Sequence, residues 1–370
     1  MSKIAIIGDT HFGLKAVKPI IKSNVEEAQY KYFEYLKEYF IANDVTTILF
    51  TGDIHDTRVS VDVKALVFTR RMMKTLLKDF DKHIVAGNHD MYYENVNDIS
   101  SLELFEDIPN LTIHREGIVK KELVGKTWYF MPWIVPDAEE KTKEFLIQLS
   151  NNSPDIRKNT VIFGHFDMFG INMEGGQLST SGIDPNMFLN AADLTISGHY
   201  HGKSDTVKSG GLIRYVGSPY PLSFSNVDSV HGVWLMDENS MEFIENKISP
   251  TFVDIYDTDD IDSFGDLSNS FVRFYVANQN SNEEEFNLRL KMESKKPLLI
   301  MPIPYSIAVD ESGDKTESEQ EATKIIGMDT YRLSELYIEN NPNTLPVLKL
   351  SDDPVAEILK QIKHFSNEMK

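Results

Sequence analysis

The stretch Ile4-Ala5-Ile6-Ile7-Gly8-Asp9-Thr10-His11 decides the fold class, because an apolar run is followed at once by a glycine and metal-binding residue types. Short β-branched runs of this kind are typical of buried strands. The same arrangement returns four times along the first 200 residues. The five strands expected from it cover residues 3–7, 46–50, 83–86, 159–163 and 194–197.

Helical patterns separate the first strands from one another. Tyr30, Phe33, Leu36 and Phe40 recur at the spacing of one helix face, and residues 63–80 carry a second apolar stripe. Alternation of strands and helices predicts an α/β sheet with crossover connections. Further strands are expected beyond residue 196, where a mixed sheet or the edge of a sandwich is predicted. They cover residues 213–216, 233–236 and 242–244.

The composition excludes several classes of protein. Without cysteine there is no disulfide, no Cys-ligated zinc, no iron–sulfur cluster and no thiol nucleophile, so a metal must be held by His, Asp, Glu or Asn. The formal net charge of −20 argues against a freestanding nucleic-acid binder, because affinity for phosphates comes from Lys and Arg. A cytoplasmic protein is expected, since neither a signal segment nor a membrane-spanning apolar run is found.

The length of 370 residues suggests two or three domains. We expect the main α/β domain over residues 1–253 and a small α+β domain over residues 254–309. Residues 310–324 are acidic and poor in apolar side chains, which is typical of a flexible linker. Helices are expected over residues 325–370, the last of them starting at Asp353 and carrying an apolar stripe.

The polar residues behind the five strands are of the types that bind divalent metals. In open α/β sheets, sites form beyond the carboxyl ends of the strands, so these residues are expected to converge on one crevice. A single ion needs about four to six donors, whereas two ions sharing a bridging carboxylate need more. Asp53 is the natural bridge. The proposed metal ligands are Asp9, His11, Asp53, Asn88, His165, His199 and His201.

Each of these motifs has a simpler interpretation when it is taken alone, because Gly-Asp after a strand is a common turn. Five of them in order, each behind a buried strand, favour the metal site. Two metals about 3.5–4 Å apart can clamp a phosphate and make a hydroxide that attacks phosphorus in line. His89 lies beside Asn88 and is not needed as a ligand, so it is expected to donate a proton to the leaving oxygen.

The motif series Asp-x-His, Gly-Asp, Gly-Asn-His-Asp, Gly-His and Gly-His-x-His resembles that of the calcineurin-like dinuclear metallophosphoesterases. Within that superfamily the chain is most similar to the nuclease subunit of SbcCD-type recombination and double-strand-break repair complexes, in the versions carried by large tailed phages. The similarity extends to Met131-Pro132-Trp133 and to residues 214–219. It implies a four-layer α/β/β/α domain, a DNA-capping domain, manganese as the working metal, and a coiled-coil ABC-type ATPase partner. A homodimer within a heterotetramer is implied as well.

The resemblance also assigns roles to single residues. His89 matches the catalytic histidine, and Asp90 would orient it. Archaeal and eukaryotic members carry a second active-site histidine three residues after the bridging aspartate, where this chain has Asp56. The neighbouring His55 would point the other way in an extended segment and is left out of the catalytic set. One metal would be held by Asp9, His11 and His201, and the other by Asn88, His165 and His199, with Asp53 bridging.

The leading hypothesis is a manganese-dependent DNA exo- or endonuclease, coupled to an ATPase in DNA-end processing, recombination, repair and replication. The alternatives are a small-molecule phosphodiesterase or phosphatase of the same superfamily, and a non-catalytic DNA-end tether. The last helix is expected to dock on the coiled coil of the ATPase. Bound ions would offset the charge of Asp9 and Asp53, so a phosphate can bind in the site of an acidic protein. Because the rest of the chain is acidic, it is expected to bind DNA poorly alone and chiefly together with its partner.

Two further features have structural interpretations. Trp128, Trp133 and Trp234 lie in strand-like runs and are expected in the core. The glycine-rich loop 170–182 either shapes a substrate cleft or is a plain surface loop.

Overall fold

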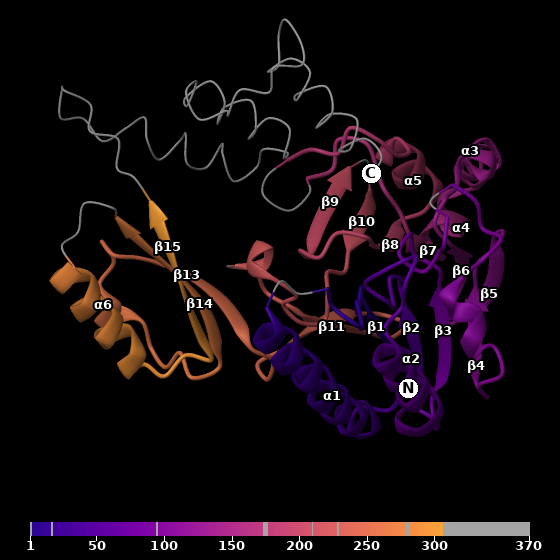
Figure 1. The fold of residues 1–370 in the computed structure, drawn as a ribbon. Helices are drawn as coiled ribbons and strands as arrows, with labels where there is room; N and C mark the ends of the chain where they lie inside the picture. The colour runs from indigo at the N-terminus through magenta and orange to yellow at the C-terminus, as the bar shows by residue number, and fades with distance from the viewer. Residues whose placement is uncertain are drawn as a thin grey trace, which may run out of the picture. The chain divides into compact units, whose positions relative to one another are not determined.

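The computed structural model describes residues 2–15, 18–93, 95–172, 177–208, 210–227, 229–277 and 282–305 (Figure 1). A first six-stranded sheet has the strand order β12-β11-β1-β2-β3-β4. β1 to β4 are parallel neighbours, while β11 lies antiparallel to β1 and β12 antiparallel to β11. The strands are β1 (Lys3–Ile7), β2 (Val45–Phe50), β3 (Asp81–Val85), β4 (Leu111–His114), β11 (Gly232–Met236) and β12 (Met241–Glu245).

A second six-stranded sheet has the order β5-β6-β7-β8-β10-β9. Its four central strands run parallel, and the edge strands β5 and β9 are antiparallel to their neighbours. The strands are β5 (Val119–Leu123), β6 (Lys126–Met131), β7 (Thr160–His165), β8 (Leu194–Gly198), β9 (Ser204–Lys208) and β10 (Gly211–Tyr215). All five strands expected in front of metal-binding motifs are confirmed, three of them in the first sheet and two in the second.

The two sheets pack face to face with helices outside them (Figure 1). One apolar cluster joins Ile6 and Leu49 of the first sheet to Trp128 and Phe163 of the second. A second cluster lies between the first sheet and the helices α1 and α2, and a third between the second sheet and α3 and α5. The four-layer α/β/β/α arrangement is therefore confirmed. The helices here are α1 (Pro19–Ala42), α2 (Val63–Arg71), α3 (Pro136–Ser150), α4 (Pro154–Lys158) and α5 (Pro185–Ala191).

Helix α1 shows how sequence and packing agree. Proline occupies its first turn, where its missing N–H costs no helical hydrogen bond. Phe33, Leu36 and Phe40 are fully buried against the first sheet, as their spacing predicts. The prediction was wrong for Tyr30, which is only half-buried, while Tyr32 is fully buried. Single helical turns also occur at Met72–Leu76, Ser101–Phe105, Phe224–Asn226 and Ile261–Ser263.

A three-stranded sheet follows in the chain, built from β13 (Thr251–Tyr256), β14 (Ser270–Ala277) and β15 (Leu299–Tyr305), with helix α6 (Asn282–Ser294). It has an apolar core of its own, which includes Ile255, Phe274 and Met292. These strands and this helix agree with the α+β character expected for residues 254–309, although β13 starts before residue 254. The division into domains stays a prediction, and the proposed linker and C-terminal helices, residues 310–370, lie outside the described residues.

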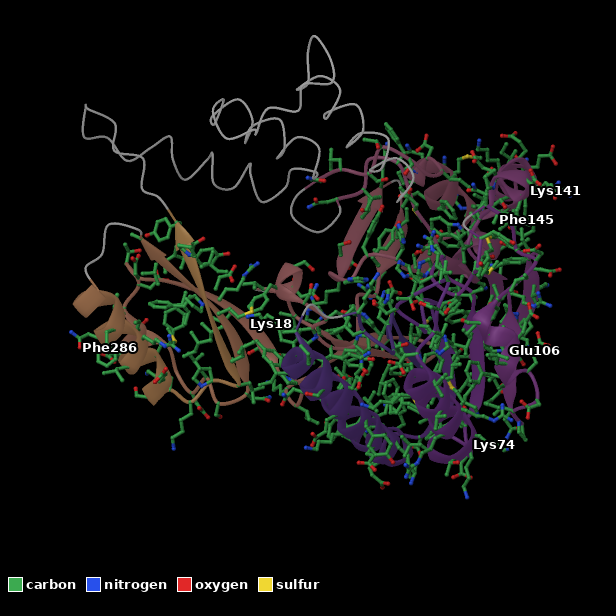
Figure 2. All side chains as sticks on the ribbon, viewed as in Figure 1. Lys18, Lys74, Glu106, Lys141, Phe145 and Phe286 are labelled. Atoms are coloured by element: carbon green, nitrogen blue, oxygen red, sulfur yellow. The ribbon has the colours of Figure 1, made fainter. Side chains whose placement is uncertain are left out.

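Two further properties concern the helices. Helix α6 carries Phe286, whose side chain is 60% exposed (Figure 2). Over the described ranges, no helix combines the length and the apolar character that crossing a membrane requires.

Candidate metal centre

The ends of β1, β2, β3, β7 and β8 bring the proposed ligands together. Two groups of three side chains form, and within each group the candidate ligand atoms lie within 4.8 Å of one another. The first group contains Asp9, His11 and His201, and the second contains Asp53, His165 and His199. The grouping matches the division between two metals that the resemblance implies, and residues almost two hundred positions apart meet in it.

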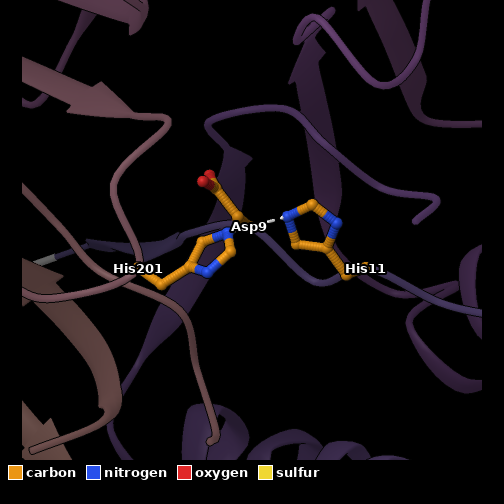
Figure 3. Close-up of side chains that lie close together, drawn as sticks. All are labelled: Asp9, His11 and His201. Carbon is orange, nitrogen blue, oxygen red and sulfur yellow. Dashed lines mark hydrogen bonds between the residues drawn. The ribbon is translucent and has the colours of Figure 1, made fainter. Parts of the chain in front are cut away.

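The first group has two imidazoles facing each other. Nε2 of His201 lies 3.0 Å from Nε2 of His11 (Figure 3). Asp9 is fully buried beside them, and its Oδ2 accepts a hydrogen bond of 2.8 Å from the backbone N–H of His199. Both facing nitrogens are candidate metal ligands, because the lone pair of a deprotonated imidazole nitrogen can bind a cation.

The second group includes the side-chain amide of Asn88. Its Oδ1 lies 2.9 Å from Nε2 of His165 and 3.2 Å from Nδ1 of His199. Asp53 is placed between the two groups, because its Oδ2 lies 3.4 Å from His165 Nε2 and 3.8 Å from His11 Nε2. The structure thus brings all seven predicted ligands together, with Asp53 in the position that a bridging ligand requires.

Three of the proposed ligands sit in strained backbone conformations. The φ angles of His11, Asp53 and His199 are 44°, 48° and 95°, in a region that non-glycine residues rarely adopt. Such strain clusters at functional sites, where surrounding structure enforces it. The glycine of the third motif is required by close packing, since a Cβ on Gly87 would lie 2.2 Å from Oδ1 of Asp53.

Electrostatics in the site are dominated by burial and by contacts between carboxylates and imidazoles. Burial raises the pKa of Asp9. Burial also opposes ionisation of Asp53, but the imidazoles of His165 and His89 hold its pKa well below the usual range. Burial would lower the pKa of His165, yet Asp53 and Asp9 outweigh it and raise that pKa to about 9. Burial, reinforced by His165, lowers the pKa of His199 to about 3.

The donor set fits a pair of divalent cations. Two buried carboxylates, one amide oxygen and four imidazoles converge, and oxygen and nitrogen donors suit hard to borderline ions. Asp53 and Asp9 favour the protonated form of His165, whose positive charge would offset part of theirs. Divalent ions would take over that role and release the proton.

His89 is held by two contacts to the second motif. Its backbone N–H donates to Oδ1 of Asp53 at 2.8 Å, and its Nδ1–H donates to the backbone carbonyl of Asp56 at 2.6 Å. The ring lies edge-on to His11, with 5.0 Å between ring centroids. These contacts leave Nε2 of His89 as the nitrogen that can exchange a proton with a bound substrate.

The contact expected between Asp90 and His89 is not the one that forms. The carboxylate of Asp90 is fully buried and accepts hydrogen bonds of 2.9 Å from the backbone N–H groups of Ile54 and Gly87. Both carboxylate oxygens are therefore engaged with the backbone of the second and third motifs. Asp90 joins these two loops to each other, and the carbonyl of Asp56 orients the histidine instead.

Asp56 contacts a proposed metal ligand, His11, as well as the proposed proton donor, His89. The sequence did not predict either contact. Oδ1 of Asp56 lies 3.3 Å from Nδ1 of His11, and Oδ2 of Asp56 accepts a hydrogen bond of 2.8 Å from the backbone N–H of Lys15. The neighbouring His55 is buried, with its ring nitrogens 3.1 Å from the hydroxyl oxygens of Ser101 and Thr69. Burial lowers the pKa of His55 to about 4, so it is a neutral, internally bonded side chain.

The three tryptophans differ from one another in their surroundings. Trp128 and Trp234 belong to the cluster between the two sheets, as predicted. The prediction was wrong for Trp133, which is half-buried and borders the second group of ligands. Its ring centroid lies 5.2 Å from that of His199 and 5.9 Å from that of His165. Strand β6 ends at Met131, so Trp133 lies beyond the sheet, where alternation no longer places it inside.

The loop that starts near Gly170 is connected to the fifth motif. Asp167 accepts hydrogen bonds of 2.7 Å from the hydroxyls of Tyr200 and Ser179. The Tyr200 ring lies 4.8 Å from the His199 ring. The described part of the loop is thus attached to a ligand-bearing segment, and its contribution to a substrate cleft stays a prediction.

Comparisons with known proteins show what the chain is similar to. The family model of the calcineurin-like phosphoesterases matches residues 2–203. A curated relative, exonuclease subunit 1 of enterobacteria phage T4, is 27% identical over 314 residues, which cover 84% of this chain and 87% of the relative. Similar solved structures include a dimetal phosphatase from Danio rerio (TM-score 0.39, 12% identity, 66% of this chain and 95% of that one). Another is the phosphopantetheinyl hydrolase of Mycobacterium tuberculosis (TM-score 0.35, 13% identity, 60% and 90%).

Proposed function

The chain belongs to the calcineurin-like phosphoesterase family, and from this premise we propose that it is a manganese-dependent DNA nuclease that hydrolyses phosphodiester bonds with two metal ions. One observation carries the proposal. Seven oxygen and nitrogen donors form two adjacent groups joined by Asp53, with His89 positioned beside them as a proton donor. This set of side chains supports a two-metal hydrolase rather than a catalytically inactive relative of one.

The proposed mechanism divides the work between the metal pair and the chain. Two bound divalent ions would neutralise phosphate charge and lower the pKa of the attacking water. Asp53 would be shared between the ions, while Asp9, His11 and His201 hold one and Asn88, His165 and His199 hold the other. His89, fixed through Nδ1 by the carbonyl of Asp56, would deliver a proton from Nε2 to the leaving oxygen.

DNA is proposed as the substrate because the phage T4 relative is an exonuclease subunit and aligns over most of both chains. Because that relative is one subunit of an exonuclease, a multi-subunit assembly is proposed for this chain as well. The proposed partner in it is a coiled-coil ATPase. The net charge of −20 favours a partner that contributes affinity for phosphates. Roles in recombination, repair and replication are proposed on the same resemblance.

A homodimer within that assembly is proposed as well. Val63 and Val67 lie one turn apart on α2 and are 73% and 63% exposed, and the adjacent Val59 is 71% exposed. Apolar side chains gathered on one surface are typical of interaction sites. These three valines support α2 as part of the contact between two copies of the chain.

An assay with two substrates tests the proposed function. The purified chain, loaded with manganese, is given linear DNA and a chromogenic phosphodiester, with and without the ATPase subunit. We expect cleavage of both substrates, with cleavage of DNA strongly increased by the ATPase. Turnover of the chromogenic ester alone would identify the small-molecule phosphodiesterase, and metal binding without any turnover would identify the non-catalytic tether.

A further inference from the structure

Trp133 is the one tryptophan outside the apolar clusters of the described residues, and it borders the second metal group. Its ring is inclined by 46° to that of His199 and by 66° to that of His165. Among the described residues these imidazoles are the rings in contact with the indole, and neither lies parallel to it. A half-buried indole in this position can still accept a flat partner on its surface.

The position of Trp133 is set by both sheets. Its backbone N–H donates to the carbonyl of Ala86 at 2.8 Å, directly behind β3 in the first sheet. Two residues earlier, Met131 pairs with Gly164 at the end of β7 in the second sheet. The indole is therefore anchored to the same strand ends that carry the ligands Asn88 and His165. Such preorganisation lowers the entropic cost of binding a partner.

We propose that Trp133 forms a nucleobase-binding subsite beside the metal centre, stacking on the base next to the phosphate that is cleaved; the proposal rests on the proposed nuclease function. The indole contacts the ring of His199, whose Nδ1 lies 3.2 Å from Oδ1 of Asn88 in the second group. Stacking of a base on an aromatic side chain contributes about 1–3 kcal/mol and tolerates any sequence, because every base has a π-face. Trp133 is thus a substrate-positioning residue.

The test uses two phosphodiesters with the same leaving group, the p-nitrophenyl esters of thymidine 5′-phosphate and of 1,2-dideoxyribose 5′-phosphate. They differ in the nucleobase alone. For the manganese-loaded chain we expect kcat/KM to be about 5- to 100-fold higher with the base present, which corresponds to the stacking energy. Trp133→Ala should abolish this preference, which is measured as the ratio of kcat/KM for the two esters within each variant so that any loss common to both esters cancels. Trp133→Phe should keep most of the preference. Phe286→Ala, at an exposed aromatic on α6, is the matched control and should behave as wild type.

Binding provides a second measurement that does not depend on turnover. Oligothymidylate and an abasic oligomer of equal length are titrated into the same four proteins, and the wild-type preference for oligothymidylate should disappear in Trp133→Ala alone. The subsite would be overturned if the wild type bound oligothymidylate and the abasic oligomer with equal affinity. It would also be overturned if Trp133→Ala kept the wild-type preference for oligothymidylate. Trp133-dependent base binding without hydrolysis of any substrate would leave the subsite standing and refute the nuclease.

Discussion

The backbone carbonyl of Asp56 accepts a 2.6 Å hydrogen bond from Nδ1 of His89, so the loop behind β2 orients a histidine of the loop behind β3. The side chain of the same aspartate lies 3.3 Å from Nδ1 of His11, in the loop behind β1. Asp56, which follows β2, therefore contacts residues of the motifs behind β1 and β3 and holds the three loops together. Its carbonyl acts on the proposed proton donor and its carboxylate on a proposed metal ligand, so the two roles can be separated by mutation.

Replacing His89 by serine should remove the proton donor and leave the metal groups in place. General acid catalysis contributes about 10²–10⁴-fold, so we expect DNA cleavage to fall by at least about 100-fold. Calorimetric titration with manganese should still show two ions with little change in affinity, because none of the seven ligands is altered. Cleavage of linear DNA at the wild-type rate would contradict the role of His89.

Replacing Asp56 by alanine should weaken metal binding rather than proton transfer. The carboxylate supports Nδ1 of His11, and loss of such a supporting group costs about 10- to 100-fold in metal affinity. The carbonyl that holds His89 is present in every variant, so turnover at saturating manganese should recover to within a few-fold of wild type. Asp56→Asn, which retains an oxygen, is the control and should bind metal more tightly than Asp56→Ala. Unchanged metal affinity with a lost kcat would show that the carboxylate acts elsewhere.

Replacing Asp90 by alanine should destabilise the fold around the site. Two buried backbone N–H groups, of Ile54 and Gly87, would lose their acceptor. Each unsatisfied donor costs about 1–3 kcal/mol, so we expect the free energy of unfolding to fall by about 2–4 kcal/mol. Urea denaturation of the metal-free protein measures this change. Asp90→Asn retains one oxygen acceptor and should lose less; equal stability of all three proteins would refute the structural role.

A histidine pair between the sheets should make the protein sensitive to acid. His83 Nδ1 lies 3.1 Å from His114 Nε2, and both side chains are buried. Burial lowers the pKa of His114 to about 3 and also lowers that of His83, whereas both groups titrate near 6.5 in the unfolded chain. The unfolded chain thus binds more protons below pH 6.5, and the free energy of unfolding falls as pH decreases from there towards 3.

The variant His114→Gln isolates this effect. It removes one titrating group, so its stability should fall less steeply than that of wild type, by about 1.4 kcal/mol per pH unit well below pH 6.5. Urea denaturation of both metal-free proteins at pH 7, 5.5 and 4.5 provides the comparison. Contributions of the metal-site histidines are common to the two proteins and cancel in the difference. Parallel pH profiles would show that His114 is protonated in the folded state.

By itself, the sequence determined the strands, the main helices and the seven candidate ligands that the structure brings together. These features depend on local patterns: a strand, a glycine and a polar residue directly behind it form a signal within ten residues of chain. The stripe Phe33, Leu36 and Phe40 on α1 is equally local, because helical spacing alone predicts which face is buried.

Tertiary structure alone decided what Asp56, Asp90 and Trp133 contact. The partners of Asp56 are 45 residues before it and 33 residues after it, and Trp133 meets side chains that follow β7 and β8 of its own sheet. No local pattern encodes such contacts, because they depend on how two sheets stack and where each strand stops. Strand ends give the site its ligands, whereas the packing of six-stranded sheets against each other decides which neighbouring groups orient those ligands and border them.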